Sequence, residues 1–223
     1  MCGVIGYSPR EGQTIEERNK SRDAFKRLFH ESTVRGKHYY GIAQVKPPSP
    51  DGFSETFNVW RSRYKASISD QFTAFTPTVA HTRFSQSGDW QVKENNQPII
   101  VSQRALAMNG VIHMGTKQEY EQAFDVYCTV DNDAEIFLRC LEKDQDASNF
   151  INTVEGSFAG VWITAEQGLF AVRNARRPLW VCKEWGAIWI ASTRDIFLRS
   201  GFSEKMNRLE PGIVFETSML EAY

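Results

Sequence analysis

The chain has 223 residues, enough for one large α/β or α+β domain with a buried core, or for two small domains. Its 26 basic and 27 acidic residues nearly balance, so bulk electrostatics gives no support for nucleic acid as a direct partner. The four cysteines show neither Cys-x-x-Cys spacing nor paired histidines nearby, which argues against a zinc site or a disulfide framework and favours a reducing, cytoplasmic compartment.

The N-terminus places Cys2 directly behind Met1 and before Gly3 and a short apolar run. Removal of Met1 would leave a thiol and a free α-amine on Cys2, and an amine with a pKa of about 7.7 to 8 is able to accept the thiol proton. The alternative is a buried structural cysteine at the start of a strand. The apolar run is too short for a signal peptide, and no stretch of the chain reaches the length of a membrane span.

Residues 14–32 are rich in charge and carry one apolar stripe at helical spacing, which predicts a helix that covers a sheet. The stripe consists of Ile15, Ala24, Phe25, Leu28 and Phe29. A glycine turn within residues 35–43 then leads into an aromatic strand, and residues 57–64 and 78–84 are predicted to be further strands. We interpret His38, which stands beside two tyrosines, as a packing or surface residue rather than a catalytic base.

The strand predicted at residues 78–84 changes from apolar to polar where it enters a Ser/Gly loop. Polar residues at the end of a strand are commonly part of a site. Arg83 is suited to bind a carboxylate through two parallel hydrogen bonds, which lysine does less well. The alternative for Arg83 is a surface salt bridge.

A further strand is predicted at residues 105–112, interrupted by Asn109 and Gly110. An Asn-Gly pair between apolar runs usually indicates a hairpin turn. The functional alternative is an oxyanion hole, made by the side-chain amide of Asn109 and the backbone N–H of Gly110.

Two helices are predicted next, at residues 117–124 and 132–141. The second begins with several acidic residues, which are ordinary N-capping and helix-dipole partners. Asp133, at the start of this helix, is equally able to bind the ammonium group of a substrate.

The C-terminal part contains four β-rich runs with the hairpin rhythm of an antiparallel sheet. They are residues 157–164, 168–173, 178–183 and 187–192. Residues 193–199 then predict a helix and residues 209–214 a turn and a last strand. Helices thus lie between two groups of strands, which favours a layered α+β architecture. The proline-rich residues 46–52 indicate a surface loop rather than a domain boundary.

Several motifs occur in an order that is informative when they are taken together. They are Cys2-Gly3, Arg35-Gly36 with Gly41, His81-Thr82-Arg83, Asn96-Gln97-Pro98, Asn109-Gly110, Asp133 with Glu135, Gly156-Ser157-Phe158-Ala159, Arg177-Pro178-Leu179 and Pro211-Gly212. This series resembles the class II glutamine amidotransferase domain, the glutaminase branch of the N-terminal nucleophile hydrolases. The resemblance implies an α+β fold in which residues 1–223 form a single glutaminase-type domain, a four-layer αββα sandwich with two antiparallel sheets.

The resemblance also implies roles for individual residues. Cys2 is similar to the family's nucleophile, with its own α-amine as the base, and Asn109 with Gly110 matches the oxyanion hole. Arg83 matches the residue that binds the α-carboxylate of glutamine, and Asp133 matches the residue that binds its α-ammonium group. The same motifs place His81 and Thr82 among the substrate-binding residues and Arg35 and Gly36 among the supporting ones.

Three departures from the family pattern mark a divergent member. Asp-Ser is usual where this chain has His38 and Tyr39, His is usual at Met108, and Glu is frequent at Thr193. None of the three removes a residue to which the resemblance assigns chemistry.

Three hypotheses for function follow from the resemblance. Family enzymes normally carry a synthase domain after the glutaminase domain, whereas this chain ends soon after its last glutaminase strand. We therefore expect a subunit that hydrolyses L-glutamine through a thioester on Cys2 and supplies ammonia to a separate synthase, with no metal or cofactor. The alternatives are an amidohydrolase of a γ-glutamyl amide metabolite and an inactive interaction subunit, although retention of the catalytic and substrate-binding residues argues against the latter.

Overall fold

Two antiparallel sheets form the centre of the molecule in a computed structural model. The structure describes residues 1–47, 56–85, 88–144, 147–166 and 168–223. Within these residues the larger sheet has seven strands and the smaller sheet has five. The larger sheet contains, from edge to edge, β11 (Met206–Arg208), β9 (Trp180–Glu184), β10 (Ala187–Ala191), β1 (Gly3–Pro9), β4 (Thr78–Arg83), β2 (Tyr39–Val45) and β3 (Phe57–Ser62). The smaller sheet contains β12 (Val214–Glu216), β8 (Gly168–Arg173), β7 (Ser157–Thr164), β6 (Arg104–Val111) and β5 (Ile99–Val101).

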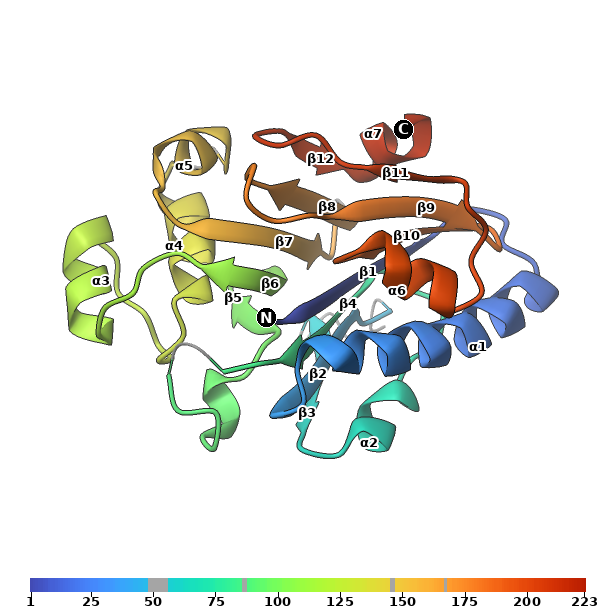
Figure 1. The fold of residues 1–223 in the computed structure, drawn as a ribbon, viewed down its shortest axis with the longest axis horizontal. Coiled ribbons are helices and arrows are strands. Elements are labelled where there is room, and N and C mark those ends of the chain that lie inside the picture. Colours follow the sequence, from blue (N-terminus) through green and yellow to red (C-terminus); the bar gives the residue numbers. More distant parts are fainter. Residues whose placement is uncertain (48–55, 86–87, 145–146, 167) are drawn as a thin grey trace.

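Helices cover the outer face of each sheet, so the layers follow the order αββα (Figure 1). The larger sheet packs against α1 (Ile15–Ser32), α2 (Lys65–Ser69) and α6 (Arg194–Arg199). The smaller sheet packs against the helices α3 (Lys117–Phe124), α4 (Ala134–Asp144) and α5 (Ala147–Thr153). A third apolar cluster lies between the sheets and includes Val4, Val79, Ala107 and Val161. The predicted four-layer α+β fold is therefore confirmed.

Helix α1 forms because its N-terminus and its apolar face both match the sequence pattern. Thr14 and Glu17 form a reciprocal capping box at its start. Phe25 and Leu28 are fully buried against the larger sheet, each stabilising the fold by roughly 1.5–3 kcal/mol. Ile15 does not belong to this face, since it is 75% exposed in the first turn of the helix.

The central strand β1 sets the direction of the N-terminal residues. Ile5 and Tyr7 face the helical layer, whereas Val4 faces the smaller sheet. Because side chains alternate along a strand, Cys2 points to the same side as Val4, toward the gap between the sheets. The same alternation in β4 directs His81 and Arg83 toward the smaller sheet.

The C-terminal strands depart from the predicted single sheet. β7 and β8 pair in the smaller sheet, whereas β9 and β10 pair in the larger one. Consecutive hairpins have the same sequence rhythm whether or not they share a sheet, so the pattern did not reveal the crossing after β8. The sequence analysis did not predict the helices α2, α5 and α7 (Thr217–Ala222) or the short strand β11. Most of the loop predicted at residues 46–52 lies outside the described residues.

None of the helices in the described part of the chain combines the length and the apolar character that a membrane crossing requires.

Candidate active site

The N-terminal residues are anchored by both sheets. The backbone nitrogen of Cys2 donates a hydrogen bond to Asn109 Oδ1 on β6, over 3.0 Å. Arg35 Nε donates to the carbonyl oxygen of Cys2 over 2.8 Å. Two residues later, the nitrogen of Val4 donates to Ser192 Oγ over 2.9 Å. Cys2 is therefore held at a fixed position between the sheets, and its side chain is 8% exposed.

A small cavity of about 20 Å³ lies beside Cys2, which is room for about one water molecule. Its walls come from β1, β4, β6, the segment before β5 and the segment before α4. The lining residues are Cys2, His81, Arg83, Phe84, Gln97, Gly110, Asn132 and Asp133. Five of the residues that the sequence predicted for the site therefore line one cavity, namely Cys2, His81, Arg83, Gly110 and Asp133. Asn109 does not line the cavity itself but is hydrogen-bonded to Cys2.

The Cys2 thiol contacts the backbone of Phe84 at the end of β4. Sγ donates to the carbonyl oxygen of Phe84 and lies within hydrogen-bonding distance of its N–H, both over 3.4 Å. Burial raises the pKa of this thiol, an effect that the contact with Phe84 and the nearby positive charges offset only in part. The thiol therefore needs a base in order to act as a nucleophile near neutral pH.

The α-amine at the N-terminus lies in surroundings that favour its neutral form. Burial lowers the pKa of the Met1 amine, and the positive charges of Arg35 and Arg177 lower it further, whereas the charge on Cys2 opposes this effect. Removal of Met1 would place the α-amine on Cys2. The carbonyl oxygen of this residue already accepts a hydrogen bond from Arg35.

Asn109 and Gly110 lie within β6 and do not form the hairpin turn that was one alternative for this pair. Their partners across the sheet are Ala159 and Phe158 on β7. Gly110 has a φ of +147°, and a Cβ atom there would lie 2.0 Å from the carbonyl oxygen of Ser157. Only glycine fits this position. The alternative of a turn does not hold, because the unusual backbone of Gly110 is accommodated inside a strand.

Two opposite charges line the cavity. The Arg83 guanidinium donates to Asn95 O and to Asn96 Oδ1, the latter over 2.8 Å. Asp133 Oδ2 accepts from the backbone nitrogen of Ile112 over 2.6 Å. Burial lowers the pKa of Arg83, while Cys2 and the carboxylate of Asp133 raise it. The alternative of a surface salt bridge for Arg83 does not hold, since this residue is only 3% exposed.

His81 lines the cavity as a neutral side chain. Its Nε2 lies 3.1 Å from the carbonyl oxygen of Met108 on β6. Burial lowers the pKa of His81 to about 3, and the neighbouring Arg83 charge acts in the same direction.

The structure does not bring Thr82 to the cavity. Its hydroxyl donates to the carbonyl oxygen of Ser32 over 2.9 Å, on the face of β4 that is covered by α1. Gly36 lies behind the site, where a Cβ atom would come within 2.3 Å of the carbonyl carbon of Arg83. Gly36 therefore permits the close approach of the chain to the end of β4, and Thr82 is a structural neighbour rather than a lining residue.

The cavity also has walls that sequence reasoning did not assign to the site. Gln97 Oε1 accepts from the backbone nitrogen of Met108 over 2.5 Å, and Asn132 Nδ2 donates to Asn95 O over 2.9 Å. The Asn96-Gln97-Pro98 motif was a signal for Gln97. Phe84 contacts the Cys2 thiol through backbone atoms, so its residue type gave no indication of this role.

His38 packs outside the cavity. Its ring stacks on Phe84 with 5.1 Å between centroids and on Trp90 with 5.5 Å. Its Nδ1 accepts from the backbone nitrogen of Ser85 over 3.0 Å. This arrangement agrees with the interpretation of His38 as a packing residue.

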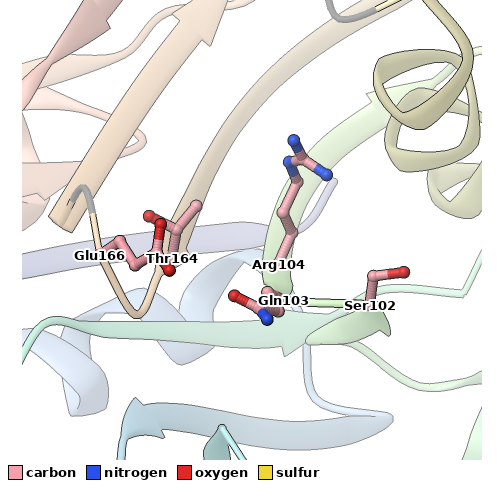
Figure 2. A pocket seen from close by; sticks show the side chains of 5 residues that line it. All are labelled: Ser102, Gln103, Arg104, Thr164 and Glu166. Atoms are coloured by element: carbon pink, nitrogen blue, oxygen red, sulfur yellow. The ribbon is translucent and has the colours of Figure 1, made fainter.

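Two other hollows lie near these sheets. A cleft of about 410 Å³ adjoins the candidate site and is lined in part by Gly88, His113 and Asp131. Figure 2 shows a second pocket, of about 240 Å³, at the turn before β6 and the end of β7. Arg104 in that pocket is the first residue of β6, so the pocket lies at the opposite end of this strand from Asn109. Among the described residues, no three His, Cys, Asp or Glu side chains are grouped so as to hold a metal ion.

Comparisons with known proteins bear on the family and the fold of the chain. The family model described as a glutamine amidotransferase domain matches residues 81–199, which is more than half of the chain. The fold is similar to glutamine phosphoribosylpyrophosphate amidotransferase from B. subtilis complexed with ADP and GMP, with a TM-score of 0.72 and 17% identity over 96% of this chain and 47% of that one. It is also similar to a structure described as the allosteric regulatory enzyme of purine biosynthesis, with a TM-score of 0.70 and 18% identity over 96% of this chain and 46% of that one. The chain thus spans about half the length of these solved structures, and a search of curated proteins gave no match.

Proposed function

Because this chain belongs to the glutamine amidotransferase domain family and shares the fold of these solved structures, we propose that it is a class II enzyme of the N-terminal nucleophile type. In this proposal it hydrolyses L-glutamine to glutamate and ammonia through a γ-glutamyl thioester on Cys2. In this proposal residues 1–223 act as one glutaminase domain. Removal of Met1 precedes activity, because the nitrogen of Cys2 is otherwise part of a peptide bond and cannot accept a proton.

The proposed reaction uses the α-amine of Cys2 as its only acid–base group. The amine takes the thiol proton while Sγ bonds to the amide carbon and the carbonyl electrons move onto oxygen. When this intermediate collapses, the C–N bond breaks and the amine returns the proton to the departing nitrogen, which leaves as ammonia. Water then adds to the thioester and gives its proton to the amine. The C–S bond breaks, the sulfur takes the proton back, and glutamate is released.

The observation that carries this proposal is the state of the Asn109 amide. Its Oδ1 accepts from the Cys2 nitrogen, while its Nδ2 is buried and has no hydrogen-bond partner among the described residues. A buried donor without a partner is destabilising, typically by about 1–3 kcal/mol, and such groups commonly have a functional reason. Beside a nucleophile, Nδ2 is suited to stabilise the negative oxygen of the intermediate together with the N–H of Gly110.

The two charges at the cavity supply the proposed recognition of the amino-acid end. Arg83 would bind the α-carboxylate through its guanidinium, and Asp133 would bind the α-ammonium group. Fixing both groups presents only a side chain of suitable length to the thiol. The adjoining cleft meets both residues, since Gly88 O accepts from Arg83 over 3.2 Å and the nitrogen of His113 donates to Asp133 over 3.4 Å. We propose that glutamine enters from this side.

The proposal extends to the fate of the ammonia. We propose that a separate synthase receives the ammonia and raises the glutaminase activity when it binds. The solved structures are about twice as long as the segment that this chain matches, which supports an acceptor site outside these 223 residues.

The test is to measure release of ammonia and glutamate from L-glutamine by protein that begins at Cys2, alone and with candidate synthases. We expect equal amounts of both products, a γ-glutamyl adduct on Cys2 in acid-quenched samples, higher activity with the correct synthase, and neither product from Cys2→Ala. Rapid cleavage of γ-glutamyl methylamide together with poor cleavage of glutamine would instead support an amidohydrolase of γ-glutamyl amides. Cleavage of neither compound, without any adduct, would contradict both enzymatic functions.

A further inference from the structure

Two buried polar atoms without a hydrogen-bond partner lie at the candidate site, and one is a donor whereas the other is an acceptor. Among the described residues, three buried side-chain polar atoms have no hydrogen-bond partner, and two of them are Asn109 Nδ2 and His81 Nδ1. Asn109 contacts Cys2, and His81 lines the cavity beside Cys2. Asn109 Nδ2 is a donor, and the following contacts identify His81 Nδ1 as an acceptor.

The tautomer of His81 follows from its single hydrogen bond. Nε2 faces the carbonyl oxygen of Met108 over 3.1 Å, and because a carbonyl only accepts, Nε2 must carry the hydrogen. A neutral imidazole has one N–H, so Nδ1 presents a lone pair. Burial lowers the pKa of His81 to about 3, so the ring stays neutral at physiological pH. His81 therefore acts as a hydrogen-bond acceptor and is unable to act as an acid.

A carboxamide provides what these two atoms lack. Its oxygen accepts hydrogen bonds and its NH₂ group donates them, whereas a carboxylate only accepts. We propose that His81 Nδ1 accepts a hydrogen bond from the side-chain NH₂ group of the substrate, and that His81 thereby makes the site select an amide over an acid. This inference rests on the proposed glutaminase function, because it concerns the same cavity and the same substrate.

Selection against an acid has a consequence for turnover. After the thioester is hydrolysed, the product carries a carboxylate where the amide stood, and its oxygens would face the lone pair of Nδ1. A site that must hydrogen-bond an N–H rejects an analogue that lacks it, because its own polar group is then left unpaired. His81 would therefore favour release of glutamate and limit product inhibition.

Two substitutions separate the two nitrogens of His81. His81→Gln places an amide near the position of Nε2, so it is able to keep the contact with Met108 while removing the Nδ1 acceptor. His81→Asn places an amide oxygen near the position of Nδ1, so it is able to keep the acceptor while losing the contact with Met108. Both variants are made in a Cys2→Ala background, where glutamine binds without reacting, and binding of glutamine and glutamate is measured by calorimetry.

The expected result is a ratio of glutamine affinity to glutamate affinity that falls about tenfold or more in His81→Gln and is retained in His81→Asn. Equal weakening of both ligands by both variants, with an unchanged ratio, would overturn the inference while leaving the glutaminase function intact. Failure of the Cys2→Ala protein with native His81 to bind glutamine at all would instead contradict the proposed function. Circular dichroism and thermal unfolding of each variant confirm that the proteins compared are folded.

Discussion

The backbone nitrogen of Cys2 donates to the side-chain oxygen of Asn109 over 3.0 Å, and this contact joins the start of β1 in the larger sheet to β6 in the smaller one. It also determines which way the Asn109 amide faces. Because Oδ1 is used by Cys2, Nδ2 is the group left for an incoming ligand. One hydrogen bond thus positions both the nucleophile and its proposed oxyanion donor.

Asn109→Ala is expected to lower kcat for glutamine about 10²–10³-fold, as loss of one oxyanion-hole donor does in other enzymes. The change in KM should be small, because the substrate ends are bound elsewhere. Asn207→Ala is the matched control, since Asn207 donates to the backbone oxygen of Tyr223 on the exposed surface. Steady-state kinetics checks the prediction, and an Asn109→Ala enzyme with undiminished kcat would contradict the oxyanion role.

Arg83→Lys is expected to raise KM for glutamine about tenfold or more, because lysine cannot bind a carboxylate through two parallel hydrogen bonds. Arg83 also holds Asn95 and Asn96, so some loss of stability is expected. Arg61→Lys is the control, since Arg61 is a half-buried arginine that donates to the backbone oxygen of Pro98 and does not line the cavity. Comparable KM changes in the two variants at equal thermal stability would argue against a specific carboxylate contact by Arg83.

Gly110→Ala is expected to destabilise the protein and abolish activity, because a Cβ atom would lie 2.0 Å from Ser157 O and the residue has a φ of +147°. Gly160→Ala, in the neighbouring strand, is the control. A Cβ atom there meets the end of the Leu106 side chain at 3.3 Å, which is able to move. Urea unfolding should show a large decrease in stability for the first variant alone, and a stable, active Gly110→Ala protein would be incompatible with this backbone geometry.

The burial of neutral His81 predicts that the protein loses stability in mild acid. The unfolded chain binds a proton at this residue near pH 6.5, whereas the folded protein does so only near pH 3. Lowering the pH therefore favours the unfolded chain, and between pH 7 and pH 5 His81 should account for a decrease of about 2 kcal/mol in unfolding free energy. That contribution is present above pH 6.5 and is lost as the pH falls toward 3.

Urea unfolding at the two pH values measures this effect. His81→Asn, which has no titrating side chain at this position, should show a decrease that is smaller by about 2 kcal/mol than that of the native protein. His30→Asn, which removes an exposed histidine at the end of α1, controls for loss of a histidine elsewhere. The same pH dependence in the native protein and in His81→Asn would contradict a neutral, buried His81.

The sequence predicted the layers of the fold more completely than their connections. Helix α1 was predictable because its capping box and the buried face around Phe25 and Leu28 are local patterns. The assignment of β7 and β9 to different sheets depends on contacts between distant strands, which hairpin spacing does not encode. Short elements such as α2 depend on tertiary packing more than on their own residues.

The candidate site was predictable where the chemistry resides in side chains. Cys2, Arg83, Asn109 and Asp133 were found by residue type and order. The contact of Phe84 was not, because it is made by backbone atoms that any residue possesses. Thr82 was grouped with its neighbours, although alternation along β4 turns its side chain to the opposite face.

If Cys2 becomes an N-terminal nucleophile in a glutamine-shaped site, it should react with an electrophilic analogue of glutamine. The most direct measurement is intact-mass spectrometry of the purified protein before and after treatment with 6-diazo-5-oxo-norleucine, a glutamine analogue that reacts with nucleophiles. We expect a mass without Met1 and a single covalent adduct, mapped by peptide sequencing to Cys2. Protein that retains Met1 should remain unlabelled until the methionine is removed. Protein that begins at Cys2 and still takes up no label would contradict both the nucleophile at Cys2 and the glutamine-shaped site.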